Sequence, residues 1–335
     1  MMDKKDIKIV YMGTPEFAES SLEAIVREGY NVTACFTQPD KMKGRSGKPV
    51  PSPVKECALK YDIPVFQPVK LREAENVQII KELDPDMIVV AAYGQILPED
   101  ILNIPRYGCV NIHASLLPKY RGAAPIEWCV INGEKETGVT TMFMAKGLDT
   151  GDMIEKSVTP IGKDETSEEL RARLAEIGAE LIISTMEKIF SGDYERTPQD
   201  DAESSYAVML KKEMGDIDWN DPAEKIERLI RGLQPWPCAV TGFQGKNLKI
   251  YKAEALADDE VSGSSALPGT DISGETDEKT IVPGMIIDRT KKHFTVKCGT
   301  GALRILSVQP EGKKKMDTAA FLNGNKVECG MMLGE

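Results

Sequence analysis

The 335-residue chain lacks the features that would assign it to a membrane or secreted class of protein. It has no run of about 18 uncharged apolar residues, so the sequence predicts no membrane-spanning helix. Its first six residues include four charged ones and lead into a short apolar segment, which is not the pattern of a signal peptide. We therefore expect a cytoplasmic protein with no membrane partner.

Patterned cysteines and nucleotide-binding glycines are also missing. The seven cysteines are odd in number, scattered, and never spaced as C-x-x-C, so we expect reduced thiols rather than a disulfide framework or a zinc site. Neither G-x-G-x-x-G nor G-x-x-x-x-G-K-[ST] occurs. In Gly13-Thr14-Pro15-Glu16, the glycine is therefore predicted to meet the steric needs of a strand-to-helix turn. A classical NAD site is not expected.

Length and composition indicate an ordinary water-soluble protein of two domains. Hydrophobic residues make up 41% of the chain and charged residues 28%, and 335 residues exceed the usual size of one core. The sequence predicts a larger domain at residues 1–190, a linker at 191–207 and a second domain at 208–335. We expect a monomer.

The first half of the chain alternates strand and helix patterns. Short apolar, β-branched runs predict strands at Ile7–Tyr11, Val32–Phe36, Met87–Ala91 and Cys109–Ile112. Thr14 and Ser52 each precede a proline and are predicted N-caps, a hairpin is expected over residues 138–158, and a helix over 166–190. This alternation predicts an α/β fold with a doubly wound, mainly parallel, Rossmann-like sheet.

Histidine is scarce, which narrows the search for proton-transfer chemistry to two residues, His113 and His293. Asn111 and His113 are two residues apart at the end of a predicted strand, so their side chains should point to the same side. Such a histidine can also be an ordinary core residue. The irregular, proline-containing segment 116–125 that follows favours a site here, whereas His293 has no accompanying acid or amide motif.

Asp149 is the candidate acid for the same site. In Gly147-Leu148-Asp149-Thr150-Gly151 an aspartate can simply form a turn, but a carboxylate beside an imidazole can fix its tautomer and stabilise the imidazolium. Asp152, three residues later, is the rival acid and is more typical of a residue entering a strand. Spacing alone does not show whether Asp149 reaches His113.

Several motifs together resemble the formyltransferases that use 10-formyltetrahydrofolate, and the resemblance runs over almost the whole chain. The sequences that carry it are Met12–Phe17, Phe36–Asp40, Pro51–Lys55, Ala92–Pro98, Val110–His113, Ser115–Pro118, Tyr120–Pro125, Gly147–Asp152, Ile217–Trp219, Pro235–Pro237, and Gln309–Pro310 with Gly312–Lys314. The resemblance implies catalytic roles for Asn111, His113 and Asp149, with 10-formyltetrahydrofolate as co-substrate and no metal. It also implies folate-binding residues: Ala92, Tyr93, Gly94, Gln95, Ile96, Leu97, Ser115, Leu116, Leu117, Pro118 and Gly147.

The acceptor implied by this resemblance is the amino group of initiator methionyl-tRNA. Asn111 and His113 would stabilise the formyl oxygen, and His113, held by Asp149, would move the proton from the attacking amine to the leaving nitrogen. Other acceptors stay open, namely a sugar amine, a purine precursor, or water in a hydrolase. A catalytically silent tRNA-binding protein would keep the basic surfaces without needing His113.

The charge distribution matters for the tRNA, because the net charge is −11 and acidic proteins bind RNA poorly. Within 208–335, the acidic stretch 254–278 has the composition of a disordered insertion; without it this region has 18 basic and 11 acidic residues. Its β-rich pattern predicts a smaller, OB-like β-barrel. A basic loop after the second strand is the other expected contact, with Arg45 assigned by the resemblance. The predicted tRNA-binding residues are Lys41, Lys43, Arg45, Lys48, Lys246, Lys249, Lys313 and Lys314.

Overall fold

The computed structural model describes residues 3–43, 48–261 and 281–334. The chain forms two compact units. The first comprises Met1–Ile126, Lys135–Ile161 and Glu169–Val208, and the second comprises Glu127–Glu134, Gly162–Glu168 and Met209–Glu335. Helix α6 (Ser167–Ser191) therefore begins in the second unit and continues in the first, and residues 191–207, the predicted linker, belong to the first.

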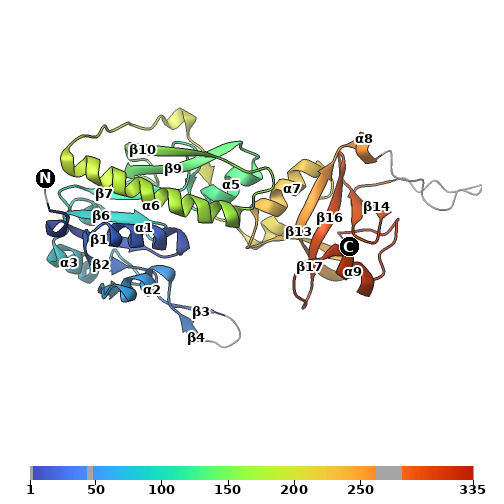
Figure 1. Cartoon of the computed structure of the whole chain (residues 1–335), viewed down its shortest axis with the longest axis horizontal. Coiled ribbons are helices and arrows are strands. Elements are labelled where there is room, and N and C mark those ends of the chain that lie inside the picture. Colours follow the sequence, from blue (N-terminus) through green and yellow to red (C-terminus); the bar gives the residue numbers. More distant parts are fainter. Residues whose placement is uncertain (1–2, 44–47, 262–280, 335) are drawn as a thin grey trace, which may run out of the picture. The chain divides into compact units, whose positions relative to one another are not determined.

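The first unit is built on a seven-stranded sheet in the order β10-β9-β7-β6-β1-β2-β5 (Figure 1). The strands are β1 (Lys8–Gly13), β2 (Asn31–Phe36), β5 (Val65–Phe66), β6 (Met87–Ala91), β7 (Cys109–His113), β9 (Glu136–Phe143) and β10 (Met153–Pro160). All neighbours from β7 to β5 pair in parallel, whereas β9 and β10 are antiparallel additions at the edge. The predicted mainly parallel sheet and its hairpin are confirmed.

Helices cover both faces of this sheet. Val77 and Ile80 of α3 (Ala74–Leu83) and Ile101 of α4 (Glu99–Leu102) share a buried cluster with residues of β1, β2, β6 and β7. On the other face, Gly178 of α6 lies against Ile112 of β7 and Phe17 of α1 (Glu16–Arg27). The sheet is therefore buried on both sides, which explains why its strands consist mainly of uninterrupted apolar residues.

The two predicted helix caps have different outcomes. Ser52 caps α2 (Pro53–Lys60), because its Oγ accepts a hydrogen bond from Lys55 N and Pro53 occupies the first turn. The prediction for Thr14 is wrong, because α1 starts one residue later with Pro15 at the cap and without a side-chain cap bond. Thr14 Oγ1 instead donates to Tyr93 O at 3.1 Å. The Thr14 hydroxyl, which the local pattern assigned to the helix cap, therefore bonds to a residue that is distant in sequence.

Close packing explains the glycine that begins the β1–α1 turn. A Cβ atom added to Gly13 would lie 2.7 Å from Ala18 Cβ and 3.0 Å from Ala91 O. The helix and the neighbouring strand thus approach the backbone too closely for any side chain. This confirms the steric interpretation of Gly13.

The second unit contains an antiparallel sheet in the order β12-β13-β16-β15-β14, with β17 paired to β16. Its elements are α7 (Ala223–Gly232), β12 (Ala239–Phe243), β13 (Lys246–Leu256), α8 (Asp258–Val261), β14 (Ile286–Arg289), β15 (Phe294–Lys297), β16 (Ala302–Pro310), β17 (Met316–Asp317) and α9 (Thr318–Gly324). Trp219, Phe243, Phe294 and Phe321 belong to its core. This is the smaller β domain expected after the α/β domain.

The predicted insertion at 254–278 is shorter than its acidic composition indicated. Residues 254–256 complete β13, and Glu254 forms an ion pair with Arg304 at 2.7 Å. Asp258 in α8 similarly pairs with Lys297 at 2.7 Å. One ion pair between neighbouring strands and one between α8 and β15 therefore connect this part of the stretch to the fold, and its remainder, 262–278, lies outside the described residues.

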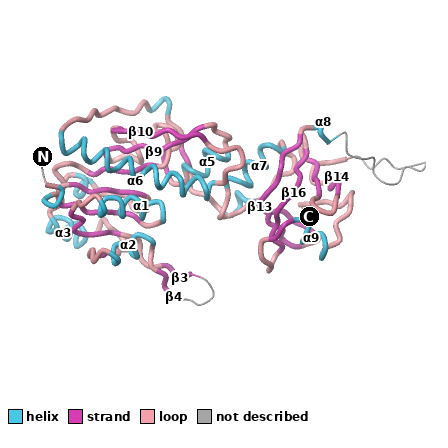
Figure 2. Tube along the Cα trace, in the orientation of Figure 1, coloured by secondary structure: helices cyan, strands magenta, loops and turns pink. Residues whose placement is uncertain are grey.

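Short elements complete the fold (Figure 2). β3 (Lys41–Lys43) and β4 (Lys48–Val50) pair as an antiparallel hairpin, and the residues between them, including Arg45, lie outside the described part of the chain. β8 (Arg121–Gly122) pairs in parallel with β11 (Tyr206–Ala207). The other helix is α5 (Pro125–Ile131), and one-turn helices occur at Lys4–Asp6, Asp201–Glu203 and Lys212–Gly215. Among the described residues, none of the helices has the length and apolar character to cross a bilayer.

Replacing Gly138 of β9 by alanine should destabilise the first unit. Its new Cβ would lie 2.1 Å from Ser157 O of β10 and 2.6 Å from a methyl group of Leu116. We expect a loss of about 1–3 kcal/mol, the usual cost of overpacking, measured as a lower unfolding midpoint. Gly324→Ala is the control, because no atom lies within 4 Å of its new Cβ. Equal midpoints for the two variants would contradict the packing described for β9.

Candidate active site

Strand β7 places Asn111 and His113 on one side of the sheet. Both side chains are buried, 8% and 6% exposed, although they are polar. β7 is paired on both edges, with Asn111 opposite Val90 of β6 and His113 opposite Thr140 of β9, so its backbone stays extended through His113. The prediction that the two side chains share a side is therefore confirmed.

One backbone carbonyl determines the tautomer of His113. Nε2 of the ring lies 2.9 Å from Tyr120 O. Since a carbonyl oxygen can only accept, Nε2 carries the proton in the neutral ring and Nδ1 keeps its lone pair. The sequence assigned the fixing of the tautomer to Asp149. In the structure the backbone carbonyl of Tyr120 fixes the tautomer instead, and Tyr120 lies in the irregular segment after β7.

Asp149 completes the group from a separate loop. Its Oδ2 accepts a hydrogen bond from Gly122 N at 2.8 Å and lies 3.8 Å from His113 Nδ1. Its Oδ1 lies 3.5 Å from Asn111 Nδ2, the outer limit of a hydrogen bond. The structure thus brings together the three predicted catalytic residues. The carboxylate faces the ring nitrogen that can accept a proton.

The rival acid, Asp152, is engaged elsewhere. Its Oδ2 forms an ion pair with Arg196 Nε at 3.0 Å, and its backbone O accepts from Phe143 N at the entry to β10. The guanidinium of Arg196 also lies 4.4 Å from the centre of the Phe143 ring. These contacts assign Asp152 to the strand entry rather than to the site around His113.

The two loops predicted to hold folate lie next to each other. Tyr93 and Leu97 from the loop after β6 share a buried cluster, against which Met144 from the Asp149 loop packs. Lys146 and Glu99 form an ion pair at 3.5 Å between the same regions. Ile96 is 81% exposed, so its side chain is accessible to a ligand.

Several predicted folate contacts have structural partners within the protein. Gln95 binds backbone atoms of the 68–71 segment, accepting from Leu71 N at 2.7 Å and donating to Pro68 O at 2.9 Å. Ser115 Oγ donates to Lys119 O at 2.7 Å, and Leu117 packs in a small buried cluster with Met142 and Met153. These side chains stabilise the conformation of the loops through contacts within the protein. The donor hydrogens of Ser115 Oγ and of one Gln95 N–H are already used in these bonds, whereas their oxygen atoms can still accept.

The predicted tRNA-binding lysines are dispersed over the surface. Lys41 is exposed in the β3–β4 hairpin, and Lys43 and Lys48 are described there only by their backbone. In the second unit Lys246, Lys313 and Lys314 are exposed, whereas Lys249 is half-buried at the side of a groove.

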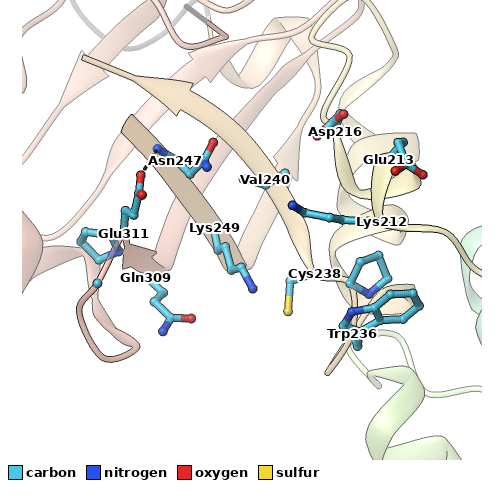
Figure 3. A pocket seen from close by; sticks show the side chains of 13 residues that line it. Lys212, Glu213, Asp216, Trp236, Cys238, Val240, Asn247, Lys249, Gln309 and Glu311 are labelled. Atoms are coloured by element: carbon cyan, nitrogen blue, oxygen red, sulfur yellow. Dashed lines mark hydrogen bonds between the residues drawn. The ribbon is translucent and has the colours of Figure 1, made fainter. Parts of the chain in front are cut away.

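The groove beside Lys249 encloses about 530 Å³ (Figure 3). Its lining includes Trp236, whose side chain is 56% exposed, and Lys212. In Figure 3 the ammonium groups of Lys212 and Lys249 point toward its middle, near Cys238. Three acids, Glu213, Asp216 and Glu311, also contribute to the lining.

Comparison with known proteins identifies the family. The Formyl transferase family model matches residues 7–186, and the model of the formyl transferase C-terminal domain matches residues 209–326. The chain is 49% identical to the methionyl-tRNA formyltransferase of Alkaliphilus metalliredigens, covering 98% of this chain and 99% of the relative. It is 47% identical to that of Geobacter sulfurreducens, covering 98% and 97%. The chain belongs to the methionyl-tRNA formyltransferase family. It is a one-carbon transferase.

Solved structures of other formyltransferases share the fold at low identity. WlaRD, a sugar 3N-formyl transferase crystallised with dTDP and 5-N-formyl-THF, superposes with a TM-score of 0.60 and 20% identity, covering 92% of this chain and 99% of that one. HypX from Aquifex aeolicus, in complex with tetrahydrofolic acid, gives 0.58 and 16%, covering 96% and 50%. These likenesses show the fold alone.

Three contributors to the site and groove were missed from the sequence. Tyr120 and Trp236 lie in motifs that carry the family resemblance, but the motifs alone predict no role for them, and Gln199, which bonds the Asp149 loop, lies in the predicted linker. Trp236 could have been found, because an indole between two prolines in a loop has little to pack against. No local signal marks Gln199, since its partners are about 50 and 78 positions away.

The thiols should be unreactive in the native protein, apart from Cys329. Six of the seven cysteines are buried, and Cys329 is partly exposed. Burial raises the pKa of Cys109, which begins β7, to about 12, and that of Cys57 to about 11, so both hold almost no thiolate at pH 8. Titration with a disulfide reagent at pH 8 should label one thiol readily and the others after unfolding. Rapid labelling of Cys109 without loss of structure would contradict its burial.

Proposed function

We propose that this protein transfers the formyl group of 10-formyltetrahydrofolate to the α-amino group of methionine on initiator methionyl-tRNA. The observation that carries the proposal is the convergence of Asn111 Nδ2 and His113 Nδ1 on the Asp149 carboxylate, at 3.5 Å and 3.8 Å. The relatives that are 47% and 49% identical over nearly the whole chain carry the name of this activity. Catalysis is assigned to residues 1–190 and tRNA binding mainly to 208–335.

The reaction needs one proton to move and one oxygen to be stabilised. The uncharged amine attacks the formyl carbon, a new C–N bond forms, and negative charge grows on the formyl oxygen. The bond from carbon to N10 of the folate then breaks, and the amine proton goes to N10. The equation balances without an oxidant or a further co-reactant.

His113 is assigned the proton transfer. With Nε2–H committed to Tyr120 O, the lone pair of Nδ1 is free to take the proton from the attacking amine and return it to N10. The resulting imidazolium would carry its new N–H beside Asp149 Oδ2, now 3.8 Å away. Asp149 would thus stabilise the charged intermediate state of the ring without itself becoming protonated.

Asn111 is assigned the developing oxyanion. Its Nδ2 group is buried but meets Asp149 Oδ1 at the long distance of 3.5 Å, so it can turn a strong hydrogen bond toward a ligand oxygen. A fixed donor of this kind gains strength where water is excluded. The donor and the base come from one strand, which fixes their separation.

The chain also fits the folate part of the formyl donor. A flat ring system needs an apolar wall and backbone polar groups along its edge. Tyr93 and Leu97, which are 2% and 4% exposed, pack with Met144 between the loops after β6 and β9. The wall itself is assigned to the partly buried Met144 and the exposed Ile96, with Tyr93 and Leu97 supporting it. The residues at this wall would bind and orient the folate, while the formyl group itself is the transferred substrate.

For the tRNA, we propose the groove of the second unit as one contact. Lys212 and Lys249 could bind phosphates, but the three acids in the lining do not favour a purely ionic site. An exposed indole is a stacking platform for an unpaired base. Trp236 is therefore assigned to a base and the lysines to the adjoining backbone. The basic hairpin residues, including Arg45, are proposed as a separate contact.

Substitutions at two of the three site residues, His113 and Asn111, test the catalytic assignment. His113→Ala should lower kcat for formyl transfer to methionyl-tRNA about a hundred- to ten-thousandfold, because the proton carrier is lost. Asn111→Ala should lower it about 10²- to 10³-fold, the usual effect of removing one oxyanion donor. Rates are measured with charged initiator tRNA and 10-formyltetrahydrofolate.

The matched control is His293→Ala, which removes the second histidine of the chain. Its kcat should match that of the unaltered protein. Full activity of His113→Ala would overturn the mechanism. Formate release at the same rate without tRNA would favour a hydrolase, and transfer to a sugar amine or a purine precursor in preference to methionyl-tRNA would replace the proposed acceptor.

The groove assignment predicts a selective defect in tRNA use. Trp236→Ala should raise KM for methionyl-tRNA about 5- to 100-fold, matching the loss of one stacked base, with KM for 10-formyltetrahydrofolate unchanged. Trp236→Phe keeps a ring and should have a smaller effect. Lys326→Ala is the control, because Lys326 is exposed and paired with Glu328. Unchanged KM for tRNA in Trp236→Ala would remove the groove from the interface.

A further inference from the structure

The segment 197–207 joins the two loops that form the candidate site. In Figure 2 the chain after α6 runs as a loop past β10, and Thr197 makes a two-bond bridge to Met153 at the start of that strand. Ten residues later, β11 pairs with β8. Between these anchors the segment contacts both the loop that carries Asp149 and the loop that carries Tyr120.

Gln199 supplies the contact to the Asp149 loop. Its Nε2 group donates to Asp149 O and to Gly151 O, both at 2.8 Å. Its Oε1 accepts from Arg121 Nε at 3.0 Å. Both amide hydrogens and the amide oxygen are thus engaged. This pattern also fixes the orientation of the amide, because a flipped amide would place its NH₂ group against Arg121 Nε–H, and both groups are donors.

Arg121 connects Gln199 to the 120–122 stretch, whose backbone contacts His113 and Asp149. It is 2% exposed, so its charged group depends on partners inside the protein. Nη2 forms an ion pair with Asp201 Oδ1 at 2.9 Å, but among the described residues it has no hydrogen-bond partner. The hydrogen bond that Arg121 Nε donates to Gln199 Oε1 therefore helps to fix the orientation of the buried guanidinium group.

The backbone on either side of Arg121 serves the site directly. Gly122 N donates to Asp149 Oδ2 at 2.8 Å, and Tyr120 O accepts from His113 Nε2 at 2.9 Å. Ser205 of the 197–207 segment holds this stretch by accepting from Tyr120 N through Oγ and from Arg121 N through its carbonyl. The bonds that Asp149 Oδ2 and His113 Nε2 make to the 120–122 stretch are therefore linked to this segment within one or two residues.

We propose that Gln199 is a positioning residue for the transfer reaction, holding the carboxylate of Asp149 at its place beside His113 Nδ1. The inference rests on the proposed function of these two residues. Gln199 contacts the backbone of the Asp149 loop and no reacting atom. Asp149 adopts a left-handed conformation, φ +52°, which is uncommon for a residue other than glycine although aspartate tolerates it, and the bond to its carbonyl oxygen supports this conformation.

Removal of the Gln199 amide should therefore affect turnover more than binding. Two carbonyl oxygens and Arg121 Nε would lose their common partner, and the Asp149 loop would be free to relax. A displacement of about 1 Å at a catalytic group can cost about a hundredfold in rate. We expect Gln199→Ala to lower kcat about 10- to 100-fold, with both KM values within about threefold of the unaltered protein, because binding surfaces are unchanged.

Gln199→Met separates hydrogen bonding from packing. Methionine has a similar length but cannot bond the carbonyl oxygens or Arg121, so its kcat should fall as far as that of Gln199→Ala. Wild-type kcat in Gln199→Met would show that the residue only fills space and would overturn the proposal. Gln78→Ala is the matched control, since Gln78 is an exposed glutamine bonded to Glu82 on α3.

A double-mutant cycle tests whether Gln199 acts through Asp149. If it does, Gln199→Ala should have almost no further effect in an Asp149→Ala background, so the two losses are not additive. Multiplicative losses in kcat, or a fall in unfolding midpoint large enough to account for the lost activity, would overturn the proposal. Failure of the unaltered protein to formylate methionyl-tRNA would instead refute the proposed function.

Discussion

The hydrogen bond from His113 Nε2 to Tyr120 O is the constraint on which the chemistry of the site depends. At 2.9 Å it assigns the proton of the neutral ring to the side away from Asp149. The opposite nitrogen then presents a lone pair to the space beside the carboxylate, 3.8 Å away. In the other tautomer Nδ1 would carry the proton and could not accept one from the amine. Asn111, His113 and Asp149 could then not perform the proposed reaction.

The site is assembled from segments that are distant in sequence. β7 supplies Asn111 and His113, the 120–122 stretch supplies backbone partners for His113 and Asp149, and Gln199 bonds the backbone of Asp149. The strand is held by pairing on both edges, and the loop of Asp149 is held by bonds from Gln199 and Gly122. Such a division lets a parallel sheet hold the base while a neighbouring loop supplies the charge that stabilises it.

Features set by local sequence were predicted well. The four strands follow from their continuous apolar, β-branched runs, the common direction of Asn111 and His113 from the alternation of side chains along a strand, and the Ser52 cap from the proline beside it. Thr14 shows the limit, because its hydroxyl meets Tyr93 O 79 positions away rather than the helix beside it. Tyr120 and Gln199 were missed for the same reason. Their roles are set by bonds that form only once the sheet is folded, and the family resemblance supplied Asp149 where spacing could not.

The tautomer of His113 is the most direct test of this account, and the chain is suited to it because it has two histidines. Nitrogen-15 NMR of the imidazole rings, at a pH where both are neutral, distinguishes a protonated Nε2 from a protonated Nδ1. The signal that disappears in His113→Ala belongs to the site. The account predicts that this ring carries its proton on Nε2. A ring protonated on Nδ1 would contradict it, because the lone pair would then face Tyr120 and no base would face Asp149.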